Sequence, residues 1–399
     1  MNFATIEISG IMEDLNIDYK GYLFRFALAV LSMVAVYSAV DFWTLRIWDT
    51  SESLVVEVVD IGDAKILSPE DDEPFRTVET ELAIQVLTGE QKEETFSIVV
   101  TQMEDNGTEL KKGRRYILIV DVFDDGSMQY SIADVFRIPS VIGVVVFACG
   151  CLIAFTGRVG ARALLGLGVS VACLLWGYIP LVVKGAPPVP LAFLAVFFIS
   201  AATVFCVVHR KQARAVVLLG SLGGVSGAFL LGALMIEIWQ VSGLAGESAS
   251  LLVTTIAGIN IKGILLSSVI ISAIGAVLDV GISITAAMSE LVEYDSEIER
   301  LRLWAAGIRV GSEVLGSMIN TLILAYIGTS LPIAILIANA GVNFWGLMND
   351  PYVSQEIVQS LAGTSGLLLT IPITATFFVL FNARKAGRGF DALTPPENE

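Results

Sequence analysis

Long apolar runs constrain what this chain can fold into more than any other feature. Runs of about 18 or more apolar residues can cross the hydrocarbon core of a bilayer as helices, and they recur through most of the sequence. Of the 399 residues, 55% are hydrophobic and 16% are charged, whereas soluble domains carry about 25% charged residues. We therefore predict a mainly α-helical, multi-pass membrane protein, whose first partner is the lipid bilayer.

The runs predict about eight transmembrane helices. The first covers residues 22–43; its short apolar centre resembles a cleavable secretory signal, but the acidic segment before it favours an uncleaved anchor. Gly328 and Pro332 interrupt one very long run, which is a kinked helix, a broken helix or a span with an outer interfacial extension. The spans after the first are expected at residues 139–156, 163–183, 189–208, 215–239, 262–288, 308–340 and 357–382.

A polar segment separates the first two spans. Five short β-branched runs lie within residues 51–134, between turn-rich stretches such as "TGEQKEE" and "DDGS". This alternation predicts about five strands, which fits a small, OB-like β-barrel. The expected domains are an N-terminal segment 1–21, an anchor helix 22–43, a β-domain 51–136, a polytopic helical membrane domain 137–384 and a tail 385–399.

Basic residues predict the orientation of the spans. The loops "GRVGAR", "HRKQAR", "ERLRLWAAGIR" and "ARKAGR" fall on one side, while the opposite short loops carry only Lys184 and Lys262. The positive-inside rule then places both termini in the cytoplasm and the β-domain on the other side of the cytoplasmic membrane. Ser296 and Glu299 form a capping-box pattern, and apolar residues at helical spacing over residues 291–304 predict an interfacial helix on the inner leaflet.

Composition excludes several classes of function. The net charge of −16 argues against nucleic acid and against anionic lipid as a primary partner. The sequence has one histidine, no clustered cysteines, and no P-loop, CxxC, HExxH or GxSxG motif. We therefore expect no enzymatic activity, no catalytic residue, no cofactor and no resident metal site.

Asp279 is the residue that most needs an explanation, because the run around it is as apolar as lipid. An ionisable group in a bilayer costs upward of about 2.5 kcal/mol, so it normally faces a cavity or a partner. Asp279 lies about nine residues from the inner end of its span, roughly 13 Å deep. Helical spacing places Ser272, Gly275 and Ser283 on the same face, which makes a narrow polar stripe.

The next span carries a second polar stripe. Glu313, Gly316, Ser317 and Asn320 follow at helical spacing, and the depth of Asp279 falls between those of Glu313 and Asn320. Two antiparallel helices could then face one carboxylate toward the other. The glycines Gly275 and Gly316 would let the two backbones approach closely.

Two interpretations of these carboxylates remain. Because two carboxylates in a low-dielectric site cannot both ionise cheaply, one takes up a proton or a cation sits between them. Alternatively, each acid is neutral, bonds a nearby serine and serves only helix packing, and Glu313 can instead reach the inner interface. In the last span, Pro372 is expected to kink the helix and free a carbonyl near Thr370.

The chain resembles the YibE/F family of bacterial multi-pass membrane proteins. The resemblance rests on "KGILLSSVIISAIGAVLDVGISITAAMSEL", "IRVGSEVLGSMINTLILAYIGTSLP" and "EIVQSLAGTSGLLLTIPITA". It covers the chain after residue 22 and implies the same plan of anchor helix, outer β-domain and helical membrane domain. The family generally has an aspartate where this chain has Glu313. It is described only as membrane or transport proteins, so the resemblance implies no substrate.

Three functions fit these observations. The leading hypothesis is a proton- or cation-coupled secondary transporter or permease of unknown substrate, in which Asp279 and Glu313 respond to the ion. The other members of this expected ion or solute site are Ser272, Ser283, Ser317 and Asn320. The alternatives are an assembly or sensor protein that binds a protein partner through the β-domain, and an ion channel. A homo-oligomer is compatible with each of them.

Overall fold

The structure is a computed structural model, and it describes residues 19–47, 53–67, 77–88, 93–103, 109–122, 128–245, 247–341 and 343–390. Most of the expected N-terminal segment and the end of the expected tail therefore lie outside the described residues. The chain divides into two compact units, Met1–Gly160 and Ala161–Glu399. Within the described part, eight helices are long and apolar enough to cross a membrane, which agrees with the predicted number.

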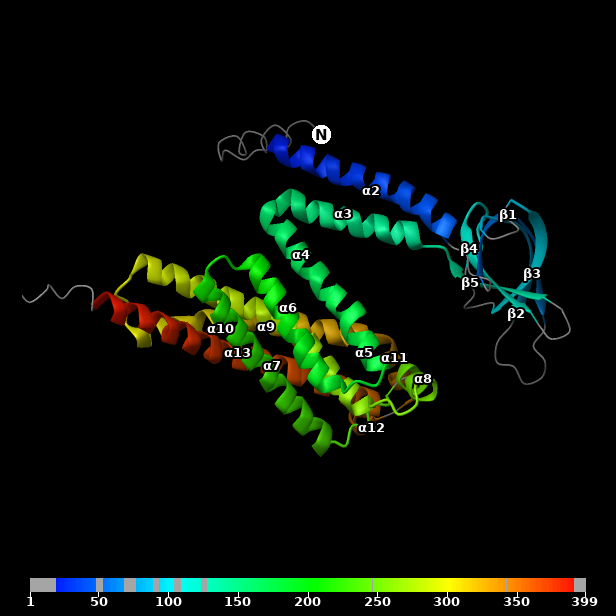
Figure 1. The fold of residues 1–399 in the computed structure, drawn as a ribbon. Helices are drawn as coiled ribbons and strands as arrows, with labels where there is room; N and C mark the ends of the chain where they lie inside the picture. The colour runs from blue at the N-terminus through cyan, green and yellow to red at the C-terminus, as the bar shows by residue number, and fades with distance from the viewer. Residues whose placement is uncertain are drawn as a thin grey trace, which may run out of the picture. The chain divides into compact units, whose positions relative to one another are not determined.

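The first unit contains the anchor helix α2 (Tyr19–Ile47) and α3 (Ile138–Thr156), which pack side by side (Figure 1). Small residues bring the two helices close, because a Cβ placed on Gly150 would lie 2.9 Å from the Cβ of Ala29. Phe26 and Phe147 meet edge to face with their ring centroids 5.9 Å apart. Thus α3, which the sequence places in the membrane domain, joins the anchor in one compact unit.

The five predicted strands all form and make one antiparallel sheet in the order β3-β2-β1-β4-β5. The outer strands β3 and β5 also come into contact (Figure 1). Alternate residues such as Val56, Leu82 and Leu118 are fully buried in the core of this β-domain. The strands are β1 (Ser53–Leu67), β2 (Thr77–Val86), β3 (Thr95–Met103), β4 (Arg115–Val122) and β5 (Met128–Val135).

Arg115 ties the β-domain to the anchor helix. Its guanidinium forms an ion pair with Asp41 near the end of α2, and its Nε lies 3.5 Å from Oε2 of Glu57. Glu57 is also the residue that faces Arg115 across the β1–β4 pairing. The three side chains are half-buried, so solvent screens them less than fully exposed pairs.

Replacing Arg115 by methionine should loosen this connection. The change keeps an apolar stem but leaves Asp41 and Glu57 without their cation, so we expect a local loss of about 1 kcal/mol and roughly fivefold faster amide exchange along β1 and β4. Hydrogen exchange read by mass spectrometry measures it. The control is Lys112→Met.

The Lys112 control removes a pair of a different kind. The Lys112 ammonium lies 3.1 Å from Asp60 and holds the pKa of that carboxyl below its usual value. Both side chains are about 70% exposed, so solvent screens the pair and exchange should not change measurably. Equal exchange in the two variants would show that Arg115 does not hold the domain to the helix.

The second unit is a bundle of membrane-length helices. The central helices are α7 (Lys211–Ile238), α9 (Ile261–Tyr294) and α13 (Pro351–Phe390), with α6 (Pro188–Val207) and α10 (Arg300–Thr329) packed beside them (Figure 1). The expected outer segment near residue 250 is the short helix α8 (Glu247–Thr255). The span before α6 is made of α4 (Arg158–Ala172), the π-helix η1 (Cys173–Tyr178) and α5 (Ile179–Val183).

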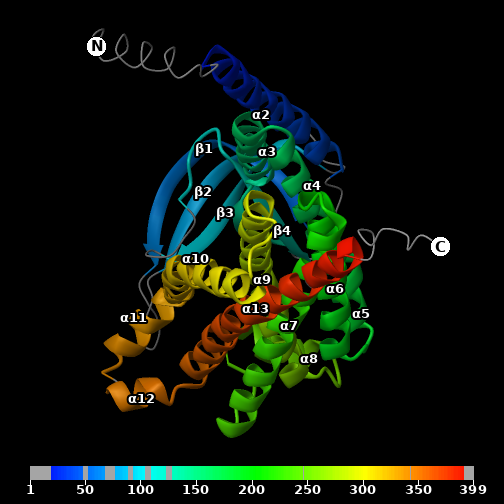
Figure 2. The same cartoon turned by 90° about the vertical axis from the view of Figure 1, so that its left-hand side faces the viewer.

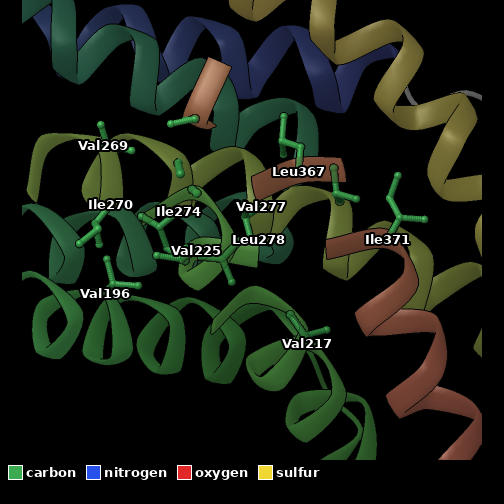
Figure 3. Packing of buried hydrophobic residues seen from close by; sticks show 14 of the residues in the cluster. Val196, Val217, Val225, Val269, Ile270, Ile274, Val277, Leu278, Leu367 and Ile371 are labelled. Atoms are coloured by element: carbon green, nitrogen blue, oxygen red, sulfur yellow. The ribbon is translucent and has the colours of Figure 1, made fainter. Parts of the chain in front are cut away.

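Branched aliphatic side chains fill the centre of this bundle. Val196 of α6, Val217 of α7, Ile270 of α9 and Leu367 of α13 belong to one buried cluster (Figure 3). Lipid is as apolar as these side chains, so burial against lipid gives little driving force and close packing between helices must stabilise the bundle. The glycine-rich contact between α7 and α13 provides this close packing.

Glycines of α7 let it cross α13 at very short range (Figure 2). A Cβ on Gly224 would lie 2.8 Å from the carbonyl oxygen of Gly366 and 1.8 Å from Oγ1 of Thr370. One turn away, a Cβ on Gly220 would lie 2.1 Å from Oγ1 of Thr374. Small residues four apart on both helices make this a small-xxx-small crossing, which is common in membranes.

The long run after residue 308 is broken, which answers the question left open by the sequence. α10 ends at Thr329 and a separate helix α11 (Leu331–Asn339) begins with Pro332 in its first turn. Proline is well tolerated there because the first N–H groups of a helix have no intrahelical partner. The short helix α12 (Phe344–Met348) follows and lies beside the start of α13 (Figure 2).

The predicted interfacial helix over residues 291–304 is wrong. α9 continues to Tyr294, a short turn follows, and α10 already begins at Arg300, so the segment is shared between two long helices. The predicted capping box is also absent, because Glu299 and not Ser296 is the N-cap residue and its side chain makes no capping bond. Charged residues continue both helices beyond their apolar parts, which hydropathy alone does not detect.

Candidate functional site

The polar stripe on α9 lies at the surface of the bundle. Asp279, Ser272 and Gly275 are exposed, and Ser283 is half-buried. The opposite face of α9 is broad and buried. It includes Ile270 and packs on α7 and α13. Among the described residues, no other side chain forms a hydrogen bond or ion pair with the carboxylate of Asp279. The acid is therefore available to lipid, water or another protein surface.

The polar stripe on α10 lies on the side away from the core. Leu303, Gly307, Gly311 and Leu315 form the buried face of α10. The residues of the stripe are all exposed: Glu313, Gly316, Ser317 and Asn320. The hydroxyl of Ser317 donates to the carbonyl of Val314 at 2.8 Å, within its own helix.

The structure brings the two stripes to the same level along α9 and α10 but does not join them. Gly307 faces Met288, and Gly311 faces Ile284, so the helices run antiparallel in a defined register. Continuing this register places Asp279 near the level of Gly316. However, in the described part of the chain no hydrogen bond connects Asp279 to Glu313.

The expected close approach at the two stripe glycines is wrong. A Cβ on Gly275 or on Gly316 would meet nothing within 4 Å. The glycines of α10 that do permit close packing are Gly307 and Gly311, which precede Gly316 in the chain and lie on another face. The polar residues and the packing residues of α10 thus lie on different faces.

A small cavity lies beside Ser272, between α9, α10 and α13. Its volume is about 10 Å³, and Ser272, Tyr326 and Thr364 contribute its polar lining. This space is close to the minimum that one water molecule needs, and the three hydroxyl-bearing side chains would supply hydrogen bonds. It brings Ser272 of the predicted site together with Tyr326 and Thr364, which the sequence did not single out.

A further acid in a membrane-length helix, Glu356, is not among the residues that the sequence analysis singled out. It lies in the second turn of α13, half-buried, next to Ser330 at the break between α10 and α11. The neighbouring Gln355 has a buried Oε1 without a hydrogen-bond partner. The sequence placed the start of this span at residue 357, so Glu356 was assigned to a loop. Counting back from the apolar core to Pro351, a good first residue for a helix, would have included it.

Pro372 lies inside α13, which continues through it as a helix. Its ring removes one backbone donor, so the carbonyl of Leu368 loses its usual partner. Thr370 uses its hydroxyl to bond the carbonyl of Gly366 at 2.7 Å, whereas Oγ1 of Thr374 is buried without a partner. The expected disturbance near Thr370 is therefore local and does not break the helix.

A large cavity opens at the end of the bundle that carries the basic loops. Its volume is about 870 Å³, and it lies between the start of α7, the end of α9, the start of α10 and the last apolar turns of α13. Between it and the small cavity, Gly307 and Gly311 pack directly on Met288, Ile284 and Ile371.

The geometry gives no indication of a resident metal. Among the described residues, no group of three or more histidine, cysteine, aspartate or glutamate side chains is placed to hold an ion. What the bundle offers instead is polar groups at successive levels of α9, α10 and α13. From one end to the other they are Glu356 with Ser330, then Ser272 with Thr364, then Asp279, then the large cavity.

Comparison with known proteins identifies the family. No curated protein and no solved structure matches the chain. The family model described as YibE/F-like protein matches residues 144–384, from α3 to the C-terminal part of α13. This match covers more than half of the chain and contains the two polar stripes, both cavities and the crossing of α7 and α13. The chain therefore belongs to the YibE/F-like protein family.

Proposed function

We propose that the chain is a secondary transporter of the bacterial cytoplasmic membrane that works by alternating access. The observation that carries the proposal is the sequence of polar groups along α9, α10 and α13, which ends in a cavity of about 870 Å³. A static anchor has no need for such a series. Under the positive-inside rule the large cavity faces the cytoplasm, so this state is open inward.

The contact between the two cavities is suited to movement. Glycine faces that pack on flat aliphatic side chains let helices slide over one another by small shear motions. α10 offers Gly307 and Gly311 to Met288 and Ile284 in this way. A shift of α10 along this contact would close the large cavity and open the small one toward the other side.

Asp279 is the ion-responsive residue in this proposal, and Glu313 is not. Asp279 shares its face with Ser272, which also lines the small cavity. Glu313 lies on the side of α10 opposite its packed face. Near the middle of a membrane, a carboxylate is stabilised by binding a proton or a cation, because the uncompensated charge costs upward of about 2.5 kcal/mol.

Cysteine accessibility in proteoliposomes tests the proposal without knowledge of the substrate. In a background whose four native cysteines are replaced by serine, Ser289→Cys reports on the large cavity and Thr364→Cys on the small one. We expect a membrane-impermeant thiol reagent to label Ser289→Cys at least about tenfold faster than Thr364→Cys. An imposed proton or Na⁺ gradient should then slow this labelling and speed that of Thr364→Cys, because the two states exchange population.

The same measurement separates the other functions. An ion channel predicts that both cysteines become accessible together, with unitary currents in a planar bilayer. A static anchor predicts that no gradient changes either rate. Either result would contradict alternating access.

The β-domain supports a second candidate, a protein that senses or assembles with a partner. A five-stranded sheet in the order β3-β2-β1-β4-β5, with β3 and β5 also in contact, is the arrangement expected of an OB-like barrel. The ion pair of Arg115 with Asp41 would carry a change in this domain into the anchor helix. This candidate would be favoured if no gradient changed the cysteine-labelling rates but the Arg115→Met substitution did.

A further inference from the structure

The large cavity brings two unpaired cations together from distant parts of the sequence. Lys211 lies at the start of α7 and Arg300 at the start of α10, and both line the cavity. No described carboxylate lies within ion-pair distance of either. The third lining cation, Arg210, is already engaged with Glu293. Among the described lining residues, Glu297 is the one acid, so the cavity carries a net positive charge.

The other charged groups nearby do not cancel this charge. Glu299 precedes Arg300 but lies 3.6 Å from Nε of Arg302, outside the lining. The carboxylate of Asp295 accepts the backbone N–H of Glu297 at 3.0 Å in the turn between α9 and α10. Glu299 is thus paired with Arg302, and Asp295 keeps its charge but lies outside the lining.

The floor of the cavity is apolar. Val216 of α7, Leu303 of α10 and Phe378 of α13 are buried and line it. Cations therefore stand over a hydrophobic base. A ligand that fills this space has an anionic head and an apolar body, because a bare inorganic ion would leave most of the 870 Å³ to water.

Backbone donors add to the cationic side chains. The N-cap residues of α7 and α10, Arg210 and Glu299, make no side-chain capping bond. The first N–H groups of both helices therefore remain available beside Lys211 and Arg300, where helix dipoles also favour negative charge. A Lys provides three donors and an Arg five, more than the roughly four lone-pair sites of one carboxylate can accept.

We propose that this cavity binds an amphiphilic anion with a phosphate head group, held by Lys211 and Arg300 above the apolar floor. The head belongs either to an anionic lipid or to a soluble organic phosphate. That this anion is the transported cargo rests on the proposed function. The binding itself does not require transport.

Binding to the purified full-length protein in a phosphate-free detergent tests the inference. Phenyl phosphate is the probe and isothermal titration the measurement. We expect saturable binding at least about tenfold tighter than that of benzoate or of inorganic phosphate, since only phenyl phosphate supplies both head and apolar body. The double variant Lys211→Gln/Arg300→Gln should weaken this binding at least about tenfold.

Matched variants separate a specific site from a general charge effect. Arg302→Gln removes the same charge from the same helix outside the cavity and should change binding less than about twofold. Glu297→Gln removes the acid of the lining and should tighten binding a few-fold. Unchanged elution volume and melting temperature confirm that each variant is folded.

A second arm distinguishes the source of the phosphate. Protein in nanodiscs of phosphatidylcholine is titrated with phenyl phosphate with and without phosphatidylglycerol. Competition by phosphatidylglycerol assigns the site to a lipid head group, and its absence assigns the site to a soluble organic phosphate. If binding of neither compound depends on Lys211 and Arg300, the inference is overturned. Because no gradient is present, this result is independent of the cysteine-labelling test of transport.

Discussion

Gly224→Leu is expected to prevent the second unit from folding, and Gly224→Ala to destabilise it by about 1–3 kcal/mol. The Cβ of alanine would already lie 2.8 Å from the backbone carbonyl oxygen of Gly366. A backbone atom cannot rotate away as a side chain can, so α7 and α13 would have to separate. Leucine adds three further carbons at the same place.

The effect should be large because this crossing holds the centre of the bundle. Both helices also pack on α9, so a displacement at Gly224 disturbs three contacts together. In a bilayer, the lost helix packing is not offset by a hydrophobic gain elsewhere. We expect little folded Gly224→Leu protein after detergent extraction, and a melting temperature several degrees lower for Gly224→Ala.

Gly316→Ala is the matched control. A Cβ on Gly316 meets nothing within 4 Å, so alanine should be tolerated, and its better helix propensity favours it by up to about 1 kcal/mol. Size-exclusion chromatography monitored by tryptophan fluorescence measures recovery and melting for both variants. A Gly224→Ala protein as stable as Gly316→Ala would show that α7 and α13 do not meet as described.

Local patterns predicted the elements of this chain well. Eight spans and five strands follow from run length and from alternation, which depend only on neighbouring residues. The break near Pro332 also had a local signal. The ends of helices were harder to predict, because charged residues such as Arg300 continue a helix that hydropathy ends earlier.

The packing of the helices could not be predicted in the same way. The sequence predicts that the stripe around Glu313 faces inward, because polar groups in membranes usually do. In the structure the inward face of α10 is instead the one with Leu303, Gly307 and Gly311. Both faces have helical spacing, and only the shape of the neighbouring helices selects between them. The glycines of α7 carried a readable small-xxx-small signal that was overlooked.

Placement of the acids therefore changes which of them should matter. Asp279 and Glu313 were predicted as a pair, but their carboxylates are not joined by any described contact. Glu356 is a further acid, next to Ser330 at the opposite end of the bundle from the large cavity. The three acids occupy different surroundings, so exchanging each for its amide gives different expectations.

Asp279→Asn should abolish the response of cysteine labelling to an ion gradient. The amide has nearly the same size as the carboxyl group, but it neither takes up a proton nor carries a charge for a cation. We expect the gradient-driven change at Ser289→Cys and Thr364→Cys to fall to less than about one-tenth of its original size, because the gradient no longer favours one state over the other. The protein should remain folded, because Asp279 makes no described hydrogen bond or ion pair that the amide would break.

Glu313→Gln is the matched control and should keep the response, since Glu313 lies on the face of α10 away from the packed core. Glu356→Gln then decides between two places for the coupling ion. A response that persists in Asp279→Asn but disappears in Glu356→Gln would move the ion-responsive site to the Ser330 end of α13. A response lost only in Asp279→Asn would instead mean that Asp279, on the exposed face of α9, exchanges its proton or cation during each cycle. That face of α9 must then meet water or another protein surface in at least one state.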